Sequence, residues 1–233
     1  MDVNYVGEHL LPGKIGQFFV ILSFGAAILS LISYFFATNN PQEKSWKLLG
    51  RIGFFTNAIS IFIIGITLFY IIYNHFFEYH YAFAHSDEKL PTHFIISSFW
   101  EGQEGSFWLW MFWQSILGIV LICRAKTWEA PVMTFVMLCQ TFLASMLIGV
   151  EILGSRLGSS PFILLRDALQ APIFSDPNYL AMIKPRGLNA LLQNYWMVIH
   201  PPTLFLGFAS MIIPFSYAAA GLWTKRYKEW LTP

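Results

Sequence analysis

A histidine followed by two prolines stands in the segment LNALLQNYWMVIHPPTLFLGF, Leu188–Phe208. A residue before proline is pushed out of the helical conformation, and a proline readily opens a helix. We therefore expect His200 to be the N-cap of a helix that begins at Pro201, with its side chain projecting from the helix mouth. A rigidly held neutral imidazole is suited to ligating a metal, the iron of haem included. The alternative is an ordinary histidine that is hydrogen-bonded to a neighbouring loop.

The stretch SSFWEGQEGSFWLWMFWQ combines two carboxylates, two glycines and four tryptophans. Gly102 and Gly105 permit tight turns and close backbone approach. Ser106 is a candidate N-cap for the helix that follows. Glu101 and Glu104 would then lie just before a helix N-terminus, where the helix dipole favours negative charge. The tryptophans fit either an ordinary interfacial belt or a platform for a flat amphipathic ligand, and their spacing does not separate these interpretations.

The composition indicates what kind of element must position these residues. Of the 233 residues, 56% are hydrophobic and 12% are charged, whereas soluble domains carry about 25% charged residues. The net charge of +1 leaves no basic stripe to neutralise phosphates, which argues against nucleic acid as a partner. The N-terminal sequence MDVNYVGEH is acidic, so we expect no cleavable signal peptide. The chain is predicted to be an integral membrane protein in a lipid bilayer.

Five charge-free apolar runs are long enough to cross a bilayer. A backbone in lipid must satisfy its own polar groups, so each run is predicted to be a helix. The runs cover residues 15–37, 52–73, 107–123, 131–150 and 203–223. The expected fold is all-α: a single polytopic membrane domain over residues 1–233, with five transmembrane helices and two long external loops, 74–106 and 151–202.

The basic residues predict the orientation of these spans. The short connections 38–51 and 124–130 and the tail from residue 224 contain eight of the 14 basic residues, and only three of the 13 acids. Basic residues accumulate in cytoplasmic loops. We therefore expect a multi-pass protein of the inner (cytoplasmic) membrane, with an external, periplasmic N-terminus and a cytoplasmic C-terminus. Both unusual stretches would then lie at the external face.

Together the two stretches resemble the cytochrome c-type biogenesis family CcmF. LPTHFIISSFWEGQEGSFWLWMFW is similar to the family segment in which a tryptophan, a glycine and Glu-Gly-Ser precede a tryptophan-bearing helix, and RGLNALLQNYWMVIHPPTLFLGF is similar to its His-Pro-Pro segment. The resemblance implies a haem lyase subunit of cytochrome c maturation. Such a subunit holds b-type haem at the external face for covalent attachment to an apocytochrome c.

The resemblance also implies roles for individual residues. His200 would be an axial ligand of haem iron, and no other metal site is expected. Pro201 and Pro202 would fix its backbone. The neighbouring motif would shape or support the haem pocket without ligating; it consists of Trp100, Gly102, Glu104, Gly105 and Ser106. A haem chaperone, an apocytochrome c and other maturation subunits would be the partners.

Cationic residues of the second long loop are candidates for contacting the haem propionates. Arg166, Lys184 and Arg186 carry the required positive charge. The alternative is that they are ordinary solvated loop residues. The histidines of the first long loop, which include His80, are interpreted as interfacial polar residues and not as a metal site.

The family's Trp-Gly-x-Trp-x-x-x-Asp block and its second external histidine follow the fifth span, beyond Pro233. We therefore expect this chain to be the N-terminal part of such a protein. It would be incomplete for catalysis until a C-terminal half, or a separate chain, completes the site. Two alternatives of other classes stay open: a transporter or haem exporter subunit, and a structural membrane subunit without a ligand. A lyase dedicated to a nitrite reductase cannot be told apart from a general one.

Overall fold

The computed structural model describes residues 5–152 and 155–231. Five helices in this part of the chain are long and apolar enough to cross a membrane, as the sequence predicted. They are α1 (Leu10–Asn39), α2 (Lys44–Tyr73), α5 (Gln103–Arg124), α6 (Glu129–Ile148) and α8 (Tyr195–Trp223). A helix satisfies its backbone within one segment, which lipid requires. The all-α prediction is confirmed, and the chain is a multi-pass membrane protein.

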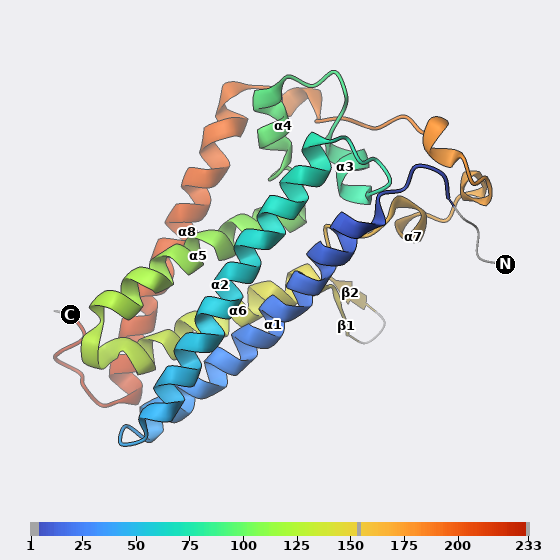
Figure 1. Ribbon diagram of the computed structural model, residues 1–233. Coiled ribbons are helices and arrows are strands. Elements are labelled where there is room, and N and C mark those ends of the chain that lie inside the picture. The colour runs from blue at the N-terminus through green and yellow to red at the C-terminus, as the bar shows by residue number, and fades with distance from the viewer. Residues whose placement is uncertain (1–4, 153–154, 232–233) are drawn as a thin grey trace.

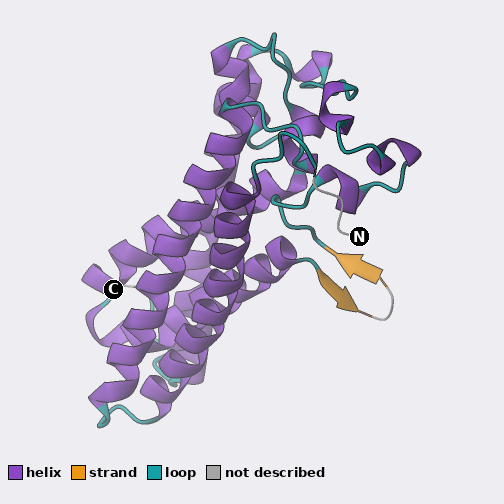
Figure 2. Ribbon diagram, turned by 45° about the vertical axis from the view of Figure 1, so that its right-hand side comes forward, coloured by secondary structure: helices purple, strands orange, loops and turns teal. Residues whose placement is uncertain are grey.

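The two long connections are built from short elements. Residues 74–102 contain the helices α3 (His80–His85) and α4 (Thr92–Ser98). Residues 149–194 contain the strands β1 (Val150–Ile152) and β2 (Ser155–Leu157), the helix α7 (Leu165–Ala168), and the 3-10 turns η2 (Pro172–Ser175), η3 (Tyr179–Ala181) and η4 (Ala190–Leu192). The strands pair antiparallel, with Val150 opposite Leu157, and this hairpin projects from the side of the helices (Figure 2). A further turn, η1 (Lys126–Trp128), precedes α6.

Small residues let α1 and α2 pack closely along their length (Figure 1). A Cβ on Gly53 would come within 2.9 Å of the backbone nitrogen of Ser30. The hydroxyl of Ser30 donates a 2.8 Å hydrogen bond to the carbonyl oxygen of Gly50. Lipid is as apolar as leucine, so close packing and hydrogen bonds, and not hydrophobicity, hold helices together there. The four-residue turn between the helices makes them an antiparallel pair.

Buried amides join this helix pair to α5 and α6. The side-chain nitrogen of Asn57 donates to the carbonyl oxygen of Ser23 at 2.8 Å. The side-chain nitrogen of Gln140 contacts the side-chain oxygen of Asn57 at 3.1 Å and the hydroxyl of Ser115 at 3.3 Å. These four residues are almost completely buried. They tie all four helices to one another in the middle of the bundle.

The short elements gather at one end of the long helices, which we call the loop end: residues 74–102 and 149–194 (Figure 1). The two long connections bind each other there through their backbones. The amide of His80 donates to the carbonyl of Ile163, and the amide of Arg186 donates to that of Phe83, both at 2.9 Å. Both long connections are therefore packed structures and not free loops.

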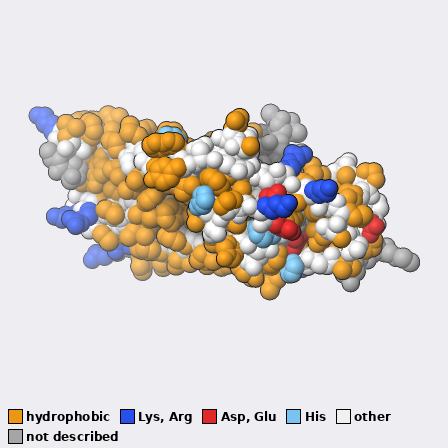
Figure 3. Space-filling model, turned by 90° about the horizontal axis from the view of Figure 1, so that it is seen from above, with side chains coloured by type: hydrophobic (Ala, Val, Ile, Leu, Met, Phe, Trp, Pro, Cys, Tyr) orange, Lys and Arg blue, Asp and Glu red, His pale blue; other side chains and the backbone are white. Residues whose placement is uncertain are grey.

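The opposite end, which we call the basic end, consists of residues 38–47, 124–130 and 224–231. It contains the turn between α1 and α2 and the tail after α8. Seen from above, lysines and arginines lie at this end, a wide hydrophobic band follows, and acidic and basic side chains lie together toward the other end (Figure 3). The band is what five spanning helices should present to lipid.

Candidate functional site

The helix that carries His200 begins earlier than the sequence analysis predicted. Its first residue is Tyr195, and its N-cap is Asn194, whose side chain accepts a hydrogen bond from the amide of Met197 at 3.2 Å. His200 therefore lies inside α8, directly before Pro201, and the prediction that it caps the helix is wrong. Asparagine is among the best N-caps. It starts the helix ahead of the prolines, outside the long apolar run.

A proline inside a helix leaves one carbonyl without its usual partner. For Pro201 that carbonyl belongs to Met197, four residues earlier. The indole nitrogen of Trp100 donates to this oxygen at 2.8 Å. The indole nitrogen of Trp113 donates to the carbonyl of Pro202 at 3.0 Å. Two tryptophans of the unusual stretch thus bond to α8 on either side of His200, and the bond from Trp100 satisfies the carbonyl that Pro201 leaves free.

His200 itself takes no part in these bonds. Its side chain is exposed, and it makes no hydrogen bond or ion pair with the residues described. The alternative was that His200 is hydrogen-bonded to a neighbouring loop. No such bond is present among the described residues. Tyr195 and Trp196, one turn earlier, are about two-thirds exposed. The arrangement is an available imidazole on a braced helix, next to exposed aromatic rings.

The turn before α5 depends on its glycines. The helix begins at Gln103 with Gly102 as its N-cap, so the prediction that Ser106 caps it is wrong. Ser106 lies in the first turn, and its hydroxyl donates to the carbonyl of Trp100 at 3.0 Å. A glycine cap lets the chain enter the helix where there is no room for a side chain. A Cβ on Gly105 would overlap the carbonyl of Phe99.

This turn is packed against Tyr81, a residue that no sequence motif marks. Its hydroxyl donates to the carbonyl of Phe99 at 2.7 Å and accepts from the amide of Gly102 at 3.1 Å. A Cβ on Gly102 would lie 2.6 Å from the Tyr81 ring. Burial raises the pKa of Tyr81, so the phenol stays protonated and keeps donating. A tyrosine among many aromatic residues gave no signal of this role.

The two acids of the turn differ in their surroundings. Glu101 accepts a hydrogen bond from the amide of Asn189 at 3.2 Å, and it pairs with the imidazole of His85 at 3.0 Å. It therefore joins α3 to the segment that leads into α8. Glu104 lies in the first turn of α5, where the helix dipole stabilises a carboxylate.

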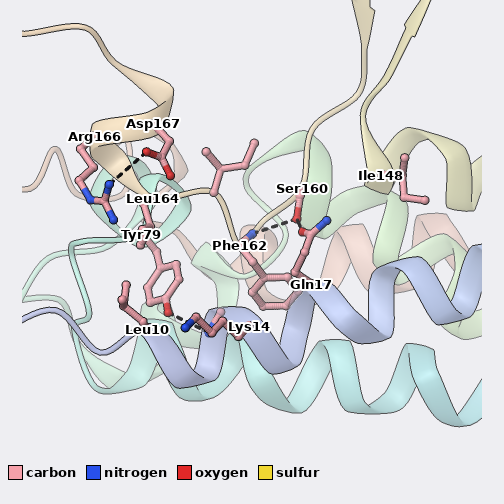
Figure 4. A pocket seen from close by; sticks show the side chains of 12 residues that line it. Leu10, Lys14, Gln17, Tyr79, Ile148, Ser160, Phe162, Leu164, Arg166 and Asp167 are labelled. Carbon is pink, nitrogen blue, oxygen red and sulfur yellow. Dashed lines mark hydrogen bonds and ion pairs between the residues drawn. The ribbon is translucent and has the colours of Figure 1, made fainter. Parts of the chain in front are cut away.

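The three candidate propionate contacts are placed differently from one another. Arg166 forms a 2.9 Å ion pair with Glu8 and lies 4.6 Å above the ring of Tyr5. It lines a cavity of about 480 Å³ between α1 and α7, together with Lys14 and other residues (Figure 4). Lys184 and Arg186 are exposed, and neither has an ion-pair partner among the described residues. Arg166 already has a structural partner, whereas the other two are free of one in this part of the chain.

A second group of polar side chains, around the start of α1, is likewise not marked by any sequence motif. Glu8 accepts from the hydroxyl of Tyr179 at 2.8 Å in addition to Arg166. Glu78 accepts from the amide of His9 at 2.8 Å. The hydroxyl of Tyr79 donates to the carbonyl of His9 at 2.6 Å, and burial raises the pKa of this tyrosine to about 12. These contacts fix the start of α1 to both long connections. Their partners are more than 60 residues apart in sequence, which a motif cannot reveal.

Comparison with known proteins places this geometry in a family. Residues 100–232 match the model of the cytochrome C assembly protein family. The chain is 28% identical over 150 residues to the cytochrome c-type biogenesis protein NrfE of Haemophilus influenzae, covering 63% of this chain and 20% of that protein. It is 28% identical over 216 residues to CcmF of Pseudomonas fluorescens, covering 90% of this chain and 29% of that protein. The chain thus spans less than a third of these relatives.

A solved structure shares the fold. The protein described as cytochrome c haem lyase CcmF superposes with a TM-score of 0.72 at 20% identity. The match covers 99% of this chain and 33% of that one. The family match begins at Trp100 and includes both unusual stretches from that residue onward, so the predicted resemblance is confirmed. This multi-pass membrane chain belongs to the cytochrome c assembly protein family.

Proposed function

We propose that this chain is a haem-handling subunit of cytochrome c maturation, and that His200 ligates haem iron at the external face of the membrane. The observation that carries the proposal is an exposed imidazole, without a partner among the described residues, on a helix whose flanking carbonyls bind Trp100 and Trp113. A ligand of this kind loses little conformational freedom when it binds, which favours affinity. The exposed rings of Tyr195 and Trp196 suit a flat apolar macrocycle.

Haem is the substrate in this proposal, held for transfer to the thiols of an apocytochrome c. The chain's own contribution is to bind and orient it. One imidazole supplies one axial ligand, so a second ligand comes from another polypeptide or from further sequence. The distribution of basic residues supports the external placement of the loop end. Lys184 and Arg186 stay candidates for the propionates, since they are exposed cations on the segment that leads to α8. Arg166 is the weaker candidate because Glu8 already neutralises it.

The test is His200→Ala in the full chain, purified with its co-expressed maturation partners. We expect the haem absorbance of the complex and covalent haem on the apocytochrome to be lost, while the amount of protein in the membrane is unchanged. His200→Gln should fail too, because an amide lacks the imidazole lone pair. Added imidazole should partly restore the alanine variant.

The matched control is His93→Ala, which removes another exposed histidine of the loop end. It should behave like the wild-type chain. Wild-type haem absorbance and wild-type covalent haem in His200→Ala would overturn the proposal and favour a structural subunit without a ligand.

A further inference from the structure

The basic end contains a cavity of about 340 Å³. Three separate parts of the chain line it: the turn between α1 and α2, the turn between α5 and α6, and the tail after α8. Four of its lining side chains are cations, Lys44, Lys47, Lys126 and Arg226, against one lining carboxylate, Glu43. Convergence of like charges on one hollow is unfavourable without a counter-ion. The cavity therefore has the electrostatics of an anion site.

Two of the four cations have partners. Lys47 pairs with the buried carboxylate of Glu129 at 2.7 Å. Arg226 pairs with Glu229 at 2.6 Å and lies 3.9 Å above the ring of Trp128. These contacts hold both side chains at the cavity wall.

The other two cations, Lys44 and Lys126, are exposed and have no ion-pair partner in the described part of the chain. Lys44 is also the first residue of α2, a 30-residue helix whose N-cap, Glu43, makes no side-chain capping bond. The amides of that first turn add positive potential to the side that Lys44 occupies. The ammonium groups of Lys44 and Lys126 and the first amides of α2 are thus available to bind an anion.

The depth of the cavity indicates where the anion comes from. Trp46 and Trp223 are sequence neighbours of the lining residues Lys47 and Thr224. The ring of Trp46 stacks on Phe36 at a centroid distance of 4.9 Å, and the ring of Trp223 stacks on Phe35 at 5.3 Å. Indoles concentrate at the level of lipid headgroups. Ala37, Pro41 and Pro131 give the same cavity an apolar part. A phosphate whose attached chains lie in the bilayer matches both parts of this lining.

We propose that the basic-end cavity binds a phosphate group, and that its source is the headgroup of an anionic phospholipid. Basic residues accumulate at the cytoplasmic face of membrane proteins in any case, so the basic residues of the same end that lie outside the cavity provide the decisive comparison. Lys225 and Lys228 are exposed there and do not line it.

The experiment compares two double variants of the purified full chain with the wild-type chain. Lys44→Gln with Lys126→Asn removes the two cavity charges. Lys225→Asn with Lys228→Gln removes two charges outside the cavity. Lys126 and Lys225 both have positive φ, 51° and 59°, and asparagine tolerates that backbone region, so the pairs are matched in strain as well as charge. Native mass spectrometry would measure retained phosphatidylglycerol and phosphatidylcholine, and a third arm would add glycerol 3-phosphate to delipidated protein.

We expect the wild-type chain to retain phosphatidylglycerol in preference to phosphatidylcholine. The cavity variant should lose about thirty-fold in retention, since it lacks two basic residues and each one near an anionic headgroup contributes about 1 kcal/mol. The control variant should retain nearly as much as the wild-type chain. Equal losses in both variants would overturn the proposal, because charge count alone would then explain binding. Saturation by glycerol 3-phosphate with no lipid preference would uphold a phosphate site and overturn the lipid source.

Discussion

Two groups of polar side chains lie where α1 and α8 meet the loop end, and they differ in whether their hydrogen-bonding and charged atoms have partners. In the group around the start of α1, the side chain of Glu8 is 3% exposed and is bound by Arg166 and Tyr179. In the group around the start of α8, His200 is exposed and has no partner among the described residues, whereas the indoles of Trp100 and Trp113 donate to carbonyls of the same helix. We call the first group closed, because its charged side chains already have partners. We call the second group open, because the His200 imidazole is available to a ligand.

The difference teaches how to separate support from chemistry in this chain. A buried charge that already has its counter-charge gains little from a ligand and is costly to disturb. Replacing an exposed side chain on a well-supported helix should hardly change the free energy of unfolding. The effect of its loss should therefore appear only in function. Substitutions in the first group should therefore lower stability, and substitutions at His200 should not.

The largest effect on stability is expected in the turn before α5, which carries Trp100. Gly105→Val would drive a branched side chain into the carbonyl of Phe99 and the hydroxyl of Tyr81. We expect a loss of about 3 kcal/mol or more in the free energy of unfolding, together with loss of cytochrome c maturation. Thermal unfolding in detergent is the measurement. Gly207→Val is the control, since a Cβ there meets nothing within 4 Å; equal stability of the two variants would show that the turn is not close-packed.

Arg166→Ala tests the closed group. It leaves the carboxylate of Glu8 buried with only Tyr179 as its partner. Breaking a buried pair costs about 3 kcal/mol, so we expect a clear fall in the midpoint of thermal unfolding. Arg186→Ala, which removes an exposed arginine, should leave the midpoint unchanged. If Arg166→Ala lowers haem capture while stability is unchanged, Arg166 belongs to the open group after all.

Trp100→Phe tests the brace with a smaller change. It keeps an aromatic ring but removes the donor to Met197, which should cost about 1 kcal/mol. Faster hydrogen exchange in the first turns of α8 would report the loosened backbone. Trp110→Phe is the matched control, because the buried indole nitrogen of Trp110 has no hydrogen-bond partner among the described residues. It should cost nothing, and identical exchange in both variants would contradict a role for the indole bond.

The smallest effect concerns His80, the first residue of α3. Burial lowers its pKa below 6.5, although Glu104 opposes the shift. In the window just below pH 6.5 the unfolded chain therefore binds more protons at this site than the folded chain, and stability falls as pH falls. We expect the midpoint of thermal unfolding to drop between pH 7.5 and 5.5, with a shallower slope in His80→Gln. An identical slope would exclude His80 as a contributor.

The sequence predicted the five spans because lipid leaves an apolar run only one regular structure. It did not predict where α5 and α8 begin. Their caps, Gly102 and Asn194, lie outside the apolar runs, in segments whose shape depends on tertiary contacts. The sequence did not predict a helix that passes through Pro201 and Pro202 for the same reason. The carbonyl of Met197, which Pro201 leaves free, is satisfied by Trp100 from a segment almost a hundred residues away.

The candidate site was predictable in its residue types and not in its connections. His200 and the tryptophan turn stand out by composition and spacing alone. Tyr81 and the Glu101 link from His85 to Asn189 do not, because each joins parts of the chain that only folding brings together.

The amides in the middle of the bundle have a consequence for how this protein is made. The α1–α2 hairpin is synthesised before α5 and α6, and it carries Asn57 into the bilayer. Within the hairpin, the side-chain nitrogen of Asn57 donates to the carbonyl of Ser23. Its side-chain oxygen accepts a hydrogen bond only once Gln140 of α6 is in place. Until then an unsatisfied polar group faces hydrocarbon, which is costly. Correct packing of α5 and α6 against the hairpin removes that cost, and incorrect packing does not. The amide of Asn57 therefore stabilises the assembled chain relative to one that is inserted in the membrane but not yet packed.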